Sequence, residues 1–156
     1  MKKGLGEIER LLFAYVQMRG QAVVRAGDLV RPLHLSAPRE RKLLSRLAKA
    51  GWIVRVQRGL YLAPQKLPLG GKWSPSEALA LNTLMKERKG RYQLSGPNAF
   101  NYYGFDEQIP VRLYAYNNRI SGEWRIGALD ITLIKVAGSR LGDTTTVPAP
   151  AMMACR

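Results

Sequence analysis

The chain has 156 residues, of which 25 are Lys or Arg and 11 are Asp or Glu, giving a formal net charge of +14, and 46% are hydrophobic. This composition excludes a disordered chain and suffices for one ordinary domain or two small ones. So large a positive charge indicates a polyanionic partner, nucleic acid first and an anionic membrane second, with a basic surface kept for solubility as the alternative.

The charge is unevenly spread along the sequence. Residues 1–70 contain 14 Lys and Arg against 4 Asp and Glu, whereas residues 71–156 contain 11 against 7. A solubility device has no reason to segregate in this way, whereas a binding face does. The N-terminal half is therefore the expected site of nucleic-acid binding.

Targeting, redox and metal signals are few. No apolar run approaches the ~18 residues of a membrane span, and Glu7, Glu9 and Arg10 interrupt what would be the apolar core of a secretory signal. The single cysteine, Cys155, cannot form an internal disulfide, which fits a reducing compartment. Cys155 and the single histidine, His34, are too few for a zinc site of about four ligands. We expect a cytoplasmic protein without membrane contact, metal or cofactor.

The N-terminal half is predicted to contain three helical segments and a hairpin. Apolar residues at helical spacing and a stop signal at Gly20 predict a helix over 7–19, followed by an extended piece at 23–24 and one or two helical turns over 28–33. A Ser36 cap and a stop signal at Gly51 predict a second long helix over 36–50. Strands are expected over 52–56 and 60–62. The connection at residues 57–59 is a tight turn. Large apolar side chains of the hairpin are expected to cover the three-helix core: Trp52, Val54, Val56, Leu60 and Leu62.

Cations dominate the second long helix and the hairpin. Between residues 39 and 58 there are seven Lys or Arg, and Glu40 is the only acid. The spacing of Arg39, Lys42, Arg46 and Lys49 places them on one outward stripe. The alternative, a helix that is merely solvated, normally mixes both signs of charge.

Three helical segments followed by a small hairpin correspond to a winged helix-turn-helix, in which a helix of groove width presents its outer stripe to base edges. We expect Arg39, Lys42 and Arg46 to contact bases, and Arg41 and Lys49 to contact phosphates. Arg58, beside Gly59 at the hairpin tip, would grip the backbone or the minor groove. The predicted DNA-binding residues are Arg39, Arg41, Lys42, Ser45, Arg46, Lys49, Arg55 and Arg58.

The second half begins after a Pro- and Gly-rich segment at residues 65–73. Ser74, Pro75 and Glu77 form a capping-box pattern, which predicts a helix from Ser74 to about residue 89. A strand at 92–94, a short helix after Gly96, a turn at residues 117–118 and three strands at 111–116, 123–126 and 131–136 are expected to follow. Residues 143–156 lack periodicity and are expected to be poorly packed.

Two segments of the sequence resemble a known family. Residues 43–62, LLSRLAKAGWIVRVQRGLYL, are similar to the N-terminal winged-helix domain of the AbiEi antitoxins, from bacterial type IV toxin–antitoxin systems linked to abortive phage infection. Residues 92–105, YQLSGPNAFNYYGF, and then 108–110, 117–119 and 131–134 continue the family's pattern in order. The resemblance covers about residues 6–142.

The resemblance implies a DNA-binding antitoxin. Its winged helix would bind inverted repeats in its own promoter and repress the operon, and its second domain would oppose a co-encoded nucleotidyltransferase-like toxin. Together with the residue patterns, it predicts an α+β protein with a winged helix-turn-helix domain at 1–64, a linker at 65–73, a small mixed α/β antitoxin domain at 74–142 and an irregular tail at 143–156.

Catalysis is not expected. The acidic residues of the second half do not fall into the spacing of a metal-dependent nuclease, Gly70-Gly71-Lys72 lacks the other residues of a phosphate-binding loop, and His34 is the only candidate base for a nucleophile. A non-enzymatic alternative remains: a winged-helix protein-interaction module, or a transcription regulator without antitoxin activity. Most aromatic residues of the second half are expected in its core, and exposed ones could serve a homodimer or toxin interface: Tyr102, Tyr103, Phe105, Tyr114, Tyr116 and Trp124.

Overall fold

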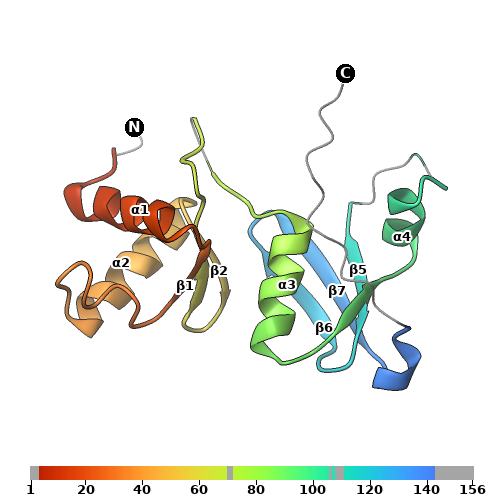
Figure 1. Ribbon diagram of the computed structural model, residues 1–156. Helices are drawn as coiled ribbons and strands as arrows, with labels where there is room; N and C mark the ends of the chain where they lie inside the picture. Colours follow the sequence, from red (N-terminus) through yellow and green to blue (C-terminus); the bar gives the residue numbers. More distant parts are fainter. Residues whose placement is uncertain (1–3, 70–71, 106, 108–110, 143–156) are drawn as a thin grey trace. The chain divides into compact units, whose positions relative to one another are not determined.

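The computed structural model describes residues 4–69, 72–105, 107 and 111–142. Its elements divide between two compact units, Met1–Pro75 and Ser76–Arg156. One sheet has three strands and the other has four, and helices accompany both (Figure 1). The α+β prediction is therefore confirmed. The predicted tail at 143–156, with Cys155, and residues 108–110 lie outside the described residues.

The first unit contains two helices and a three-stranded antiparallel sheet. Its elements are α1 (Glu7–Arg19), β1 (Val23–Arg25), α2 (Ala37–Ala50), β2 (Val54–Gln57) and β3 (Leu60–Leu62). The strand order is β1-β3-β2. The predicted stop signals are confirmed, because Gly20 and Gly51 end the two helices in the left-handed conformation that glycine adopts without strain.

The segment between β1 and α2 differs from the prediction of one or two helical turns over 28–33. Residues 26–34 form successive turns and are not a helix. The backbone N–H groups of Gly27 and Leu29 donate hydrogen bonds to the carboxylate of Glu40, at 2.6 and 2.8 Å. At the start of a regular helix such N–H groups have no partner within the helix. A side chain of α2 therefore fixes the path of this segment.

The core of the first unit lies between the helices and one face of the sheet. Val24, Ile53, Tyr61 and Ala63 belong to the same buried cluster as the apolar residues of α1 and α2, and Trp52 packs against it. Val54 pairs with Leu62 across the sheet, and direct partners in an antiparallel pair share a face. The expectation that Val54, Val56, Leu60 and Leu62 cover the helical core is thus wrong, because alternation of side chains puts them on the other face. All four are nevertheless buried.

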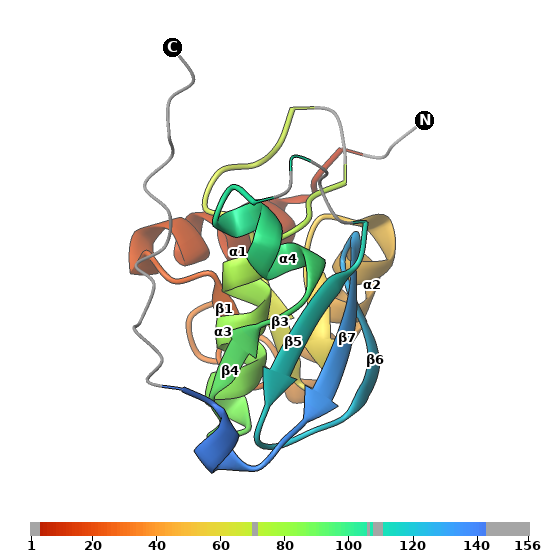
Figure 2. The same ribbon diagram turned by 90° about the vertical axis from the view of Figure 1, so that its right-hand side faces the viewer.

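The second unit packs a helix on a four-stranded mixed sheet. Its elements are α3 (Glu77–Glu87), β4 (Tyr92–Leu94), α4 (Pro97–Tyr102), β5 (Leu113–Asn117), β6 (Gly122–Ile126), β7 (Leu129–Lys135) and the 3-10 helix η1 (Gly138–Arg140). The strand order is β4-β5-β7-β6, and β5 and β7 are parallel. Strands β5, β7 and β6 present one face of this sheet to the viewer in Figure 2.

The start of α3 corrects the predicted cap. Ser76, and not Ser74, is the capping residue, since its hydroxyl accepts a hydrogen bond from the backbone N–H of Leu79 at 3.3 Å. Pro75 consequently precedes the cap, and Glu77 is the first helical residue. The helix ends at Glu87, two residues before the predicted end, and Lys89 adopts a positive φ of 51°.

The predicted turn at residues 117–118 is confirmed, and it is built on a buried amide. The side chain of Asn117 accepts from the backbone N–H groups of Arg119 and Ile120 at 2.9 and 2.8 Å, and donates to the carbonyl of Ile120 at 2.8 Å. Asparagine suits this place because its short amide can replace backbone partners in a turn. The turn allows β6 and β7 to fold back so that β7 pairs with β5.

The aromatic residues of the second half are less buried than expected. Tyr103 and Phe105 follow α4 with 71% and 79% of their surface exposed, and their rings contact each other at 6.4 Å between centroids. Tyr114 and Trp124 are half-buried, and Tyr116 is 40% exposed. The prediction that most of these side chains form the core is therefore wrong for the described ones. Tyr103 and Phe105 sit at the end of a short helix, and Tyr114 and Tyr116 lie on the sheet face opposite the buried residues. Trp124 shares a face with the buried Ile131, and the guanidinium of Arg88 lies over its ring at 5.6 Å from the centroid.

Candidate nucleic-acid interface

Helix α2 is defined at both ends by local signals. The hydroxyl of Ser36 accepts from the backbone N–H of Arg39 at 3.4 Å, and Pro38 lies in the first turn, where its missing N–H costs nothing. At the other end the N–H of Gly51 bonds to the carbonyl of Ala48. The result is a rigid helix of 14 residues whose side chains keep a fixed phase relative to the core.

One face of α2 is buried and the opposite face is basic. Glu40, Leu43, Leu44 and Leu47 are buried. At about 100° per residue, Lys42, Ser45 and Lys49 lie opposite them. Arg39 and Arg46 border this outer face on one side and Arg41 on the other. All of the predicted α2 residues are exposed: Arg39, Arg41, Lys42, Ser45, Arg46 and Lys49.

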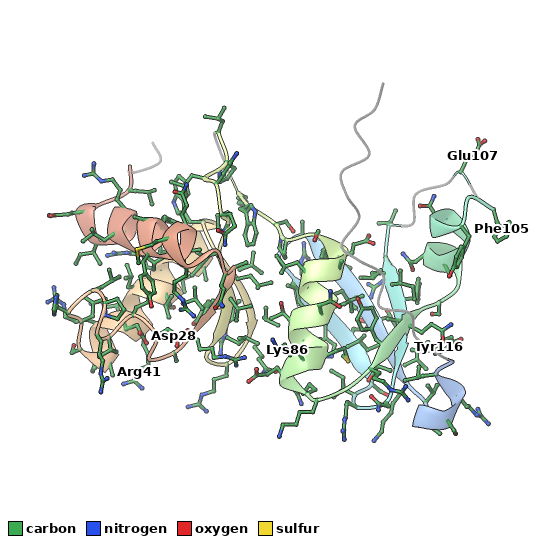
Figure 3. The ribbon with its side chains drawn as sticks, in the orientation of Figure 1. Asp28, Arg41, Lys86, Phe105, Glu107 and Tyr116 are labelled. Carbon is green, nitrogen blue, oxygen red and sulfur yellow. The ribbon has the colours of Figure 1, made fainter. Side chains whose placement is uncertain are left out.

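The single acidic residue of α2 does not reduce the positive charge that its outer face presents to solvent. Glu40 is only 1% exposed, and both of its carboxylate oxygens are engaged by backbone N–H groups of residues 27 and 29. The helix therefore presents cations without an intervening surface carboxylate. In Figure 3 the Arg41 side chain extends outward from this unit. Sequence reasoning counted Glu40 as a surface charge because nothing local distinguishes a buried acceptor from a solvated one.

The Arg46 side of the outer face is tied to α1. Arg46 forms an ion pair with Glu9, whose side chain is half-buried. A shallow hollow of about 290 Å³ lies along this edge, lined by Ile8, Leu35, Arg39, Lys42, Leu43 and Arg46. Its floor is apolar and its rim is cationic. Arg46 is thus held in place by an acid that a phosphate or base would have to displace.

Glu9→Gln is expected to raise the affinity for duplex DNA by up to about fivefold, because a surface ion pair of this kind is worth at most about 1 kcal/mol and its loss releases Arg46. Fluorescence anisotropy at a fixed salt concentration measures the change. Glu7→Gln is the matched control, since Glu7 is an exposed acid in the same first turn of α1. Equal effects of the two substitutions, or no effect of either, would contradict a role for Arg46 in binding.

The hairpin places two further predicted residues at the surface. Arg58 is exposed at the tip, next to Gly59 with a φ of 75°, whose carbonyl accepts from the N–H of Ala26 at 2.9 Å. Arg55 is exposed as well and pairs with Tyr61, so it lies on the sheet face turned toward the helices. It reaches solvent because β2 is an edge strand.

Two basic residues of this unit were not predicted as part of the site. Arg25 is the last residue of β1 and pairs with Leu60, which is two residues after Arg58 in the chain. Arg31 is exposed in the segment of turns at residues 26–34. Arg25 was missed because only the register of β1 on β3 brings it to the hairpin tip. No pattern in the sequence marks that register, since β1 has only three residues.

Other kinds of site find little support among the described residues. They contain no group of three or more His, Cys, Asp or Glu side chains that could hold a metal ion. No helix in the described part of the chain is long and apolar enough to cross a membrane. The basic face of α2 with the hairpin tip is the strongest candidate site of the first unit.

The fold has a relative among solved structures. The crystal structure of the RV2827C protein from Mycobacterium tuberculosis aligns with a TM-score of 0.55 and 15% sequence identity, over 89% of this chain and 49% of that one. The chain therefore spans about half the length of that relative. At this identity the likeness concerns the fold alone. No curated protein matches the sequence.

The sequence of the first unit also matches a family model. The match covers residues 12–64, which run from α1 through α2 to the end of the hairpin, and the family is described as "Transcriptional regulator, AbiEi antitoxin". This confirms the resemblance drawn from residues 43–62. The cationic helix and the hairpin lie entirely within the matched segment. Residues 12–64 of the first unit are thus similar to the AbiEi antitoxin family of transcriptional regulators.

Proposed function

We propose that the chain is a DNA-binding antitoxin that regulates transcription through a winged helix-turn-helix in its first unit. Helix α2 would enter the major groove, and the β2–β3 hairpin would act as the wing. The observation that carries this proposal is the outer face of α2, where all exposed charges are positive and the one acid is buried in backbone hydrogen bonds.

The side chains divide by chemistry into base-reading and phosphate-binding groups. Arg39, Lys42 and Arg46 would contact base edges, because Arg can form two parallel hydrogen bonds with guanine. Arg41 and Lys49 would hold phosphates on either side of the groove, with Ser45 between them. Arg55 and Arg58 on the hairpin would contact the backbone or the minor groove.

The regulated DNA would be the protein's own promoter, with inverted repeats read by two copies of the chain about one helical turn apart. Repression of that promoter would be one activity of the protein. The other would be antitoxicity toward a co-encoded nucleotidyltransferase-like toxin, assigned to the α/β part at residues 74–142. The support for this pair of activities is the match of residues 12–64 to the antitoxin-regulator family.

Two narrower functions compete with this proposal. The winged helix could serve as a protein-interaction module, or the chain could regulate transcription without acting as an antitoxin. The uniform positive sign of the α2 face favours a nucleic acid over a protein partner, because a protein surface normally mixes charges. The salt dependence of binding separates the two.

Binding to duplex DNA is expected to weaken steeply with salt. Neutralisation of ~4–6 phosphates per subunit gives a slope of roughly −4 to −5 when the logarithm of the association constant is plotted against that of the salt concentration. Arg58→Ala should reduce the magnitude of this slope by about 1 without changing sequence preference. A gel-shift titration of the promoter fragment at several salt concentrations measures both. A flat response would favour the protein-interaction module.

A further inference from the structure

The second unit carries a basic surface of its own at one end of its sheet. Nine Lys and Arg lie between residues 76 and 142. Two of them, Arg112 and Arg125, pair with Glu123 and Asp130 along the strands. The other seven gather where β5 and β7 end and β4 begins, and we call this set the basic pole: Lys86, Arg88, Lys89, Arg91, Arg119, Lys135 and Arg140.

Four separate segments form this pole. Residues 86–91 form the end of α3 and its connection to β4, Arg119 follows β5, Lys135 ends β7, and Arg140 belongs to η1. The register aligns them, because Asn117 pairs with Tyr92 on one side and with Lys135 on the other. The ends of α3 and β5, the start of β4 and η1 all lie at the lower end of this unit in Figure 1.

Hydrogen bonds fix these segments to one another. The guanidinium of Arg119 donates twice to the carbonyl of Lys89, at 3.1 and 2.9 Å. Arg91 donates from its backbone to the side chain of Asn118 at 2.8 Å, and from its guanidinium to the carbonyl of Gly138 at 3.1 Å. A Cβ on Gly90 would lie 2.6 Å from Arg119, so the contact tolerates no side chain there. The pole is therefore a pre-formed surface.

An aromatic side chain borders the pole on the open face of the sheet. Tyr116 and its partner across the strands, Ile134, are 40% and 39% exposed. The alternate residues of these strands, Leu113, Ala115, Ile131 and Leu133, are buried on the other face. Tyr116 immediately precedes the buried Asn117, which places its ring at the edge of the pole (Figure 3).

We propose that the second unit binds single-stranded nucleic acid, with phosphates on the basic pole and an unpaired base stacked on Tyr116. Cations that track a backbone beside an exposed ring on a sheet are the combination that recognises a single strand, since only an unpaired base offers its face to a ring. A duplex is disfavoured because its bases are stacked on each other, and because no helix among the described residues of this unit presents a basic face to a groove. The site is independent of α2 and does not rest on the proposed function.

The test uses the full chain carrying R39A, R41A, K42A, R46A and K49A, so that α2 retains none of its proposed DNA contacts except Ser45. Anisotropy is measured with a labelled RNA of roughly 12 nucleotides without self-complementarity, the DNA strand of the same sequence, and the corresponding duplex DNA. Tighter binding of either single strand than of the duplex is expected, and the comparison of RNA with DNA identifies the preferred sugar. Binding of the duplex as tight as that of both single strands, or no binding of a single strand, would overturn the proposal.

Substitutions then locate the site. Tyr116→Ala should weaken single-strand binding about 5- to 100-fold, whereas the affinity of Tyr116→Phe, which keeps the ring, should stay within about twofold of the unsubstituted value.

Replacement of Lys86, Lys89, Lys135 and Arg140 by Gln should reduce the magnitude of the salt slope by roughly 3, at about 0.7 per phosphate contact. If the fourfold variant does not fold, the pairs K86Q/K89Q and K135Q/R140Q should each remove half of that amount. Arg125→Gln, outside the pole, is the control and should leave the slope unchanged. Equal affinities of the Ala and Phe variants, or an unchanged slope, would refute the assignment.

Discussion

Simultaneous replacement of Arg39, Lys42 and Arg46 by Ala is expected to abolish specific binding to the promoter. Each base-reading contact is worth about 1–3 kcal/mol of discrimination, so the three together account for most of the difference between specific and non-specific affinity. The three side chains are exposed and line the same edge of α2, so their truncation leaves the buried stripe intact. Competition gel shifts with the promoter and with unrelated DNA of equal length measure the loss.

A charge-retaining variant separates base reading from simple attraction. The combined variant R39K, K42R and R46K keeps three positive charges. It removes the two-pronged guanidinium groups at positions 39 and 46 and places a new guanidinium at position 42. This variant should bind unrelated DNA as the natural protein does, yet lose preference for the promoter. If it kept full preference, the three residues would act on phosphates alone and bases would be read by other side chains.

The same Ala variant tests whether the two proposed activities reside in different parts of the chain. With the toxin expressed from an unrelated inducible promoter, the variant should still restore growth while a reporter driven by its own promoter is derepressed. This outcome follows if antitoxicity belongs to residues 74–142 and repression to α2. Loss of both activities in a variant that remains folded would contradict that division.

Local signals in the sequence were sufficient to predict helix boundaries that are set by a single capping residue. Both α1 and α2 stop at a glycine in the left-handed conformation, and α2 starts at a serine that caps it. Such signals act within a few residues and can be read without knowing the fold. The exposure of the predicted cations of α2 could also be predicted locally, because the spacing of its buried leucines fixes which side of the helix faces solvent.

Features that depend on contacts between distant residues were not accessible in this way. The turns at 26–34 are held by Glu40, which bonds to Gly27 and Leu29, thirteen and eleven residues before it. The parallel pairing of β5 with β7 depends on where β6 is placed, and short strands leave register open. The basic pole is a further case: four of its seven cations lie within residues 86–91, but only the fold brings Arg119, Lys135 and Arg140 beside them.

Glu40→Ala is expected to destabilise the first unit by about 3–5 kcal/mol, because two hydrogen bonds from backbone N–H groups to a charged acceptor are lost and both donors are left unpaired. At 1% exposure, no water can readily replace the carboxylate. The chain has three tryptophans, so urea unfolding is followed by fluorescence in a W73F/W124F background. Trp52, which packs against the core beside Phe13, then reports on this unit. Glu7→Ala, at an exposed acid in the first turn of α1, should cost no more than about 1 kcal/mol.

Glu40→Gln distinguishes the structural role of this carboxylate from an electrostatic one. Glutamine has nearly the same shape but offers one acceptor oxygen, so one of the N–H groups of Gly27 and Leu29 loses its partner and an intermediate loss of stability is expected. Were Glu40 instead a repulsive charge on the DNA-binding face, either substitution would tighten binding to duplex DNA at no cost in stability. Because the carboxylate points into the unit and holds the segment that precedes α2, we expect both variants to bind DNA no better than the natural protein, and the alanine variant to bind it worse as the helix loses its support.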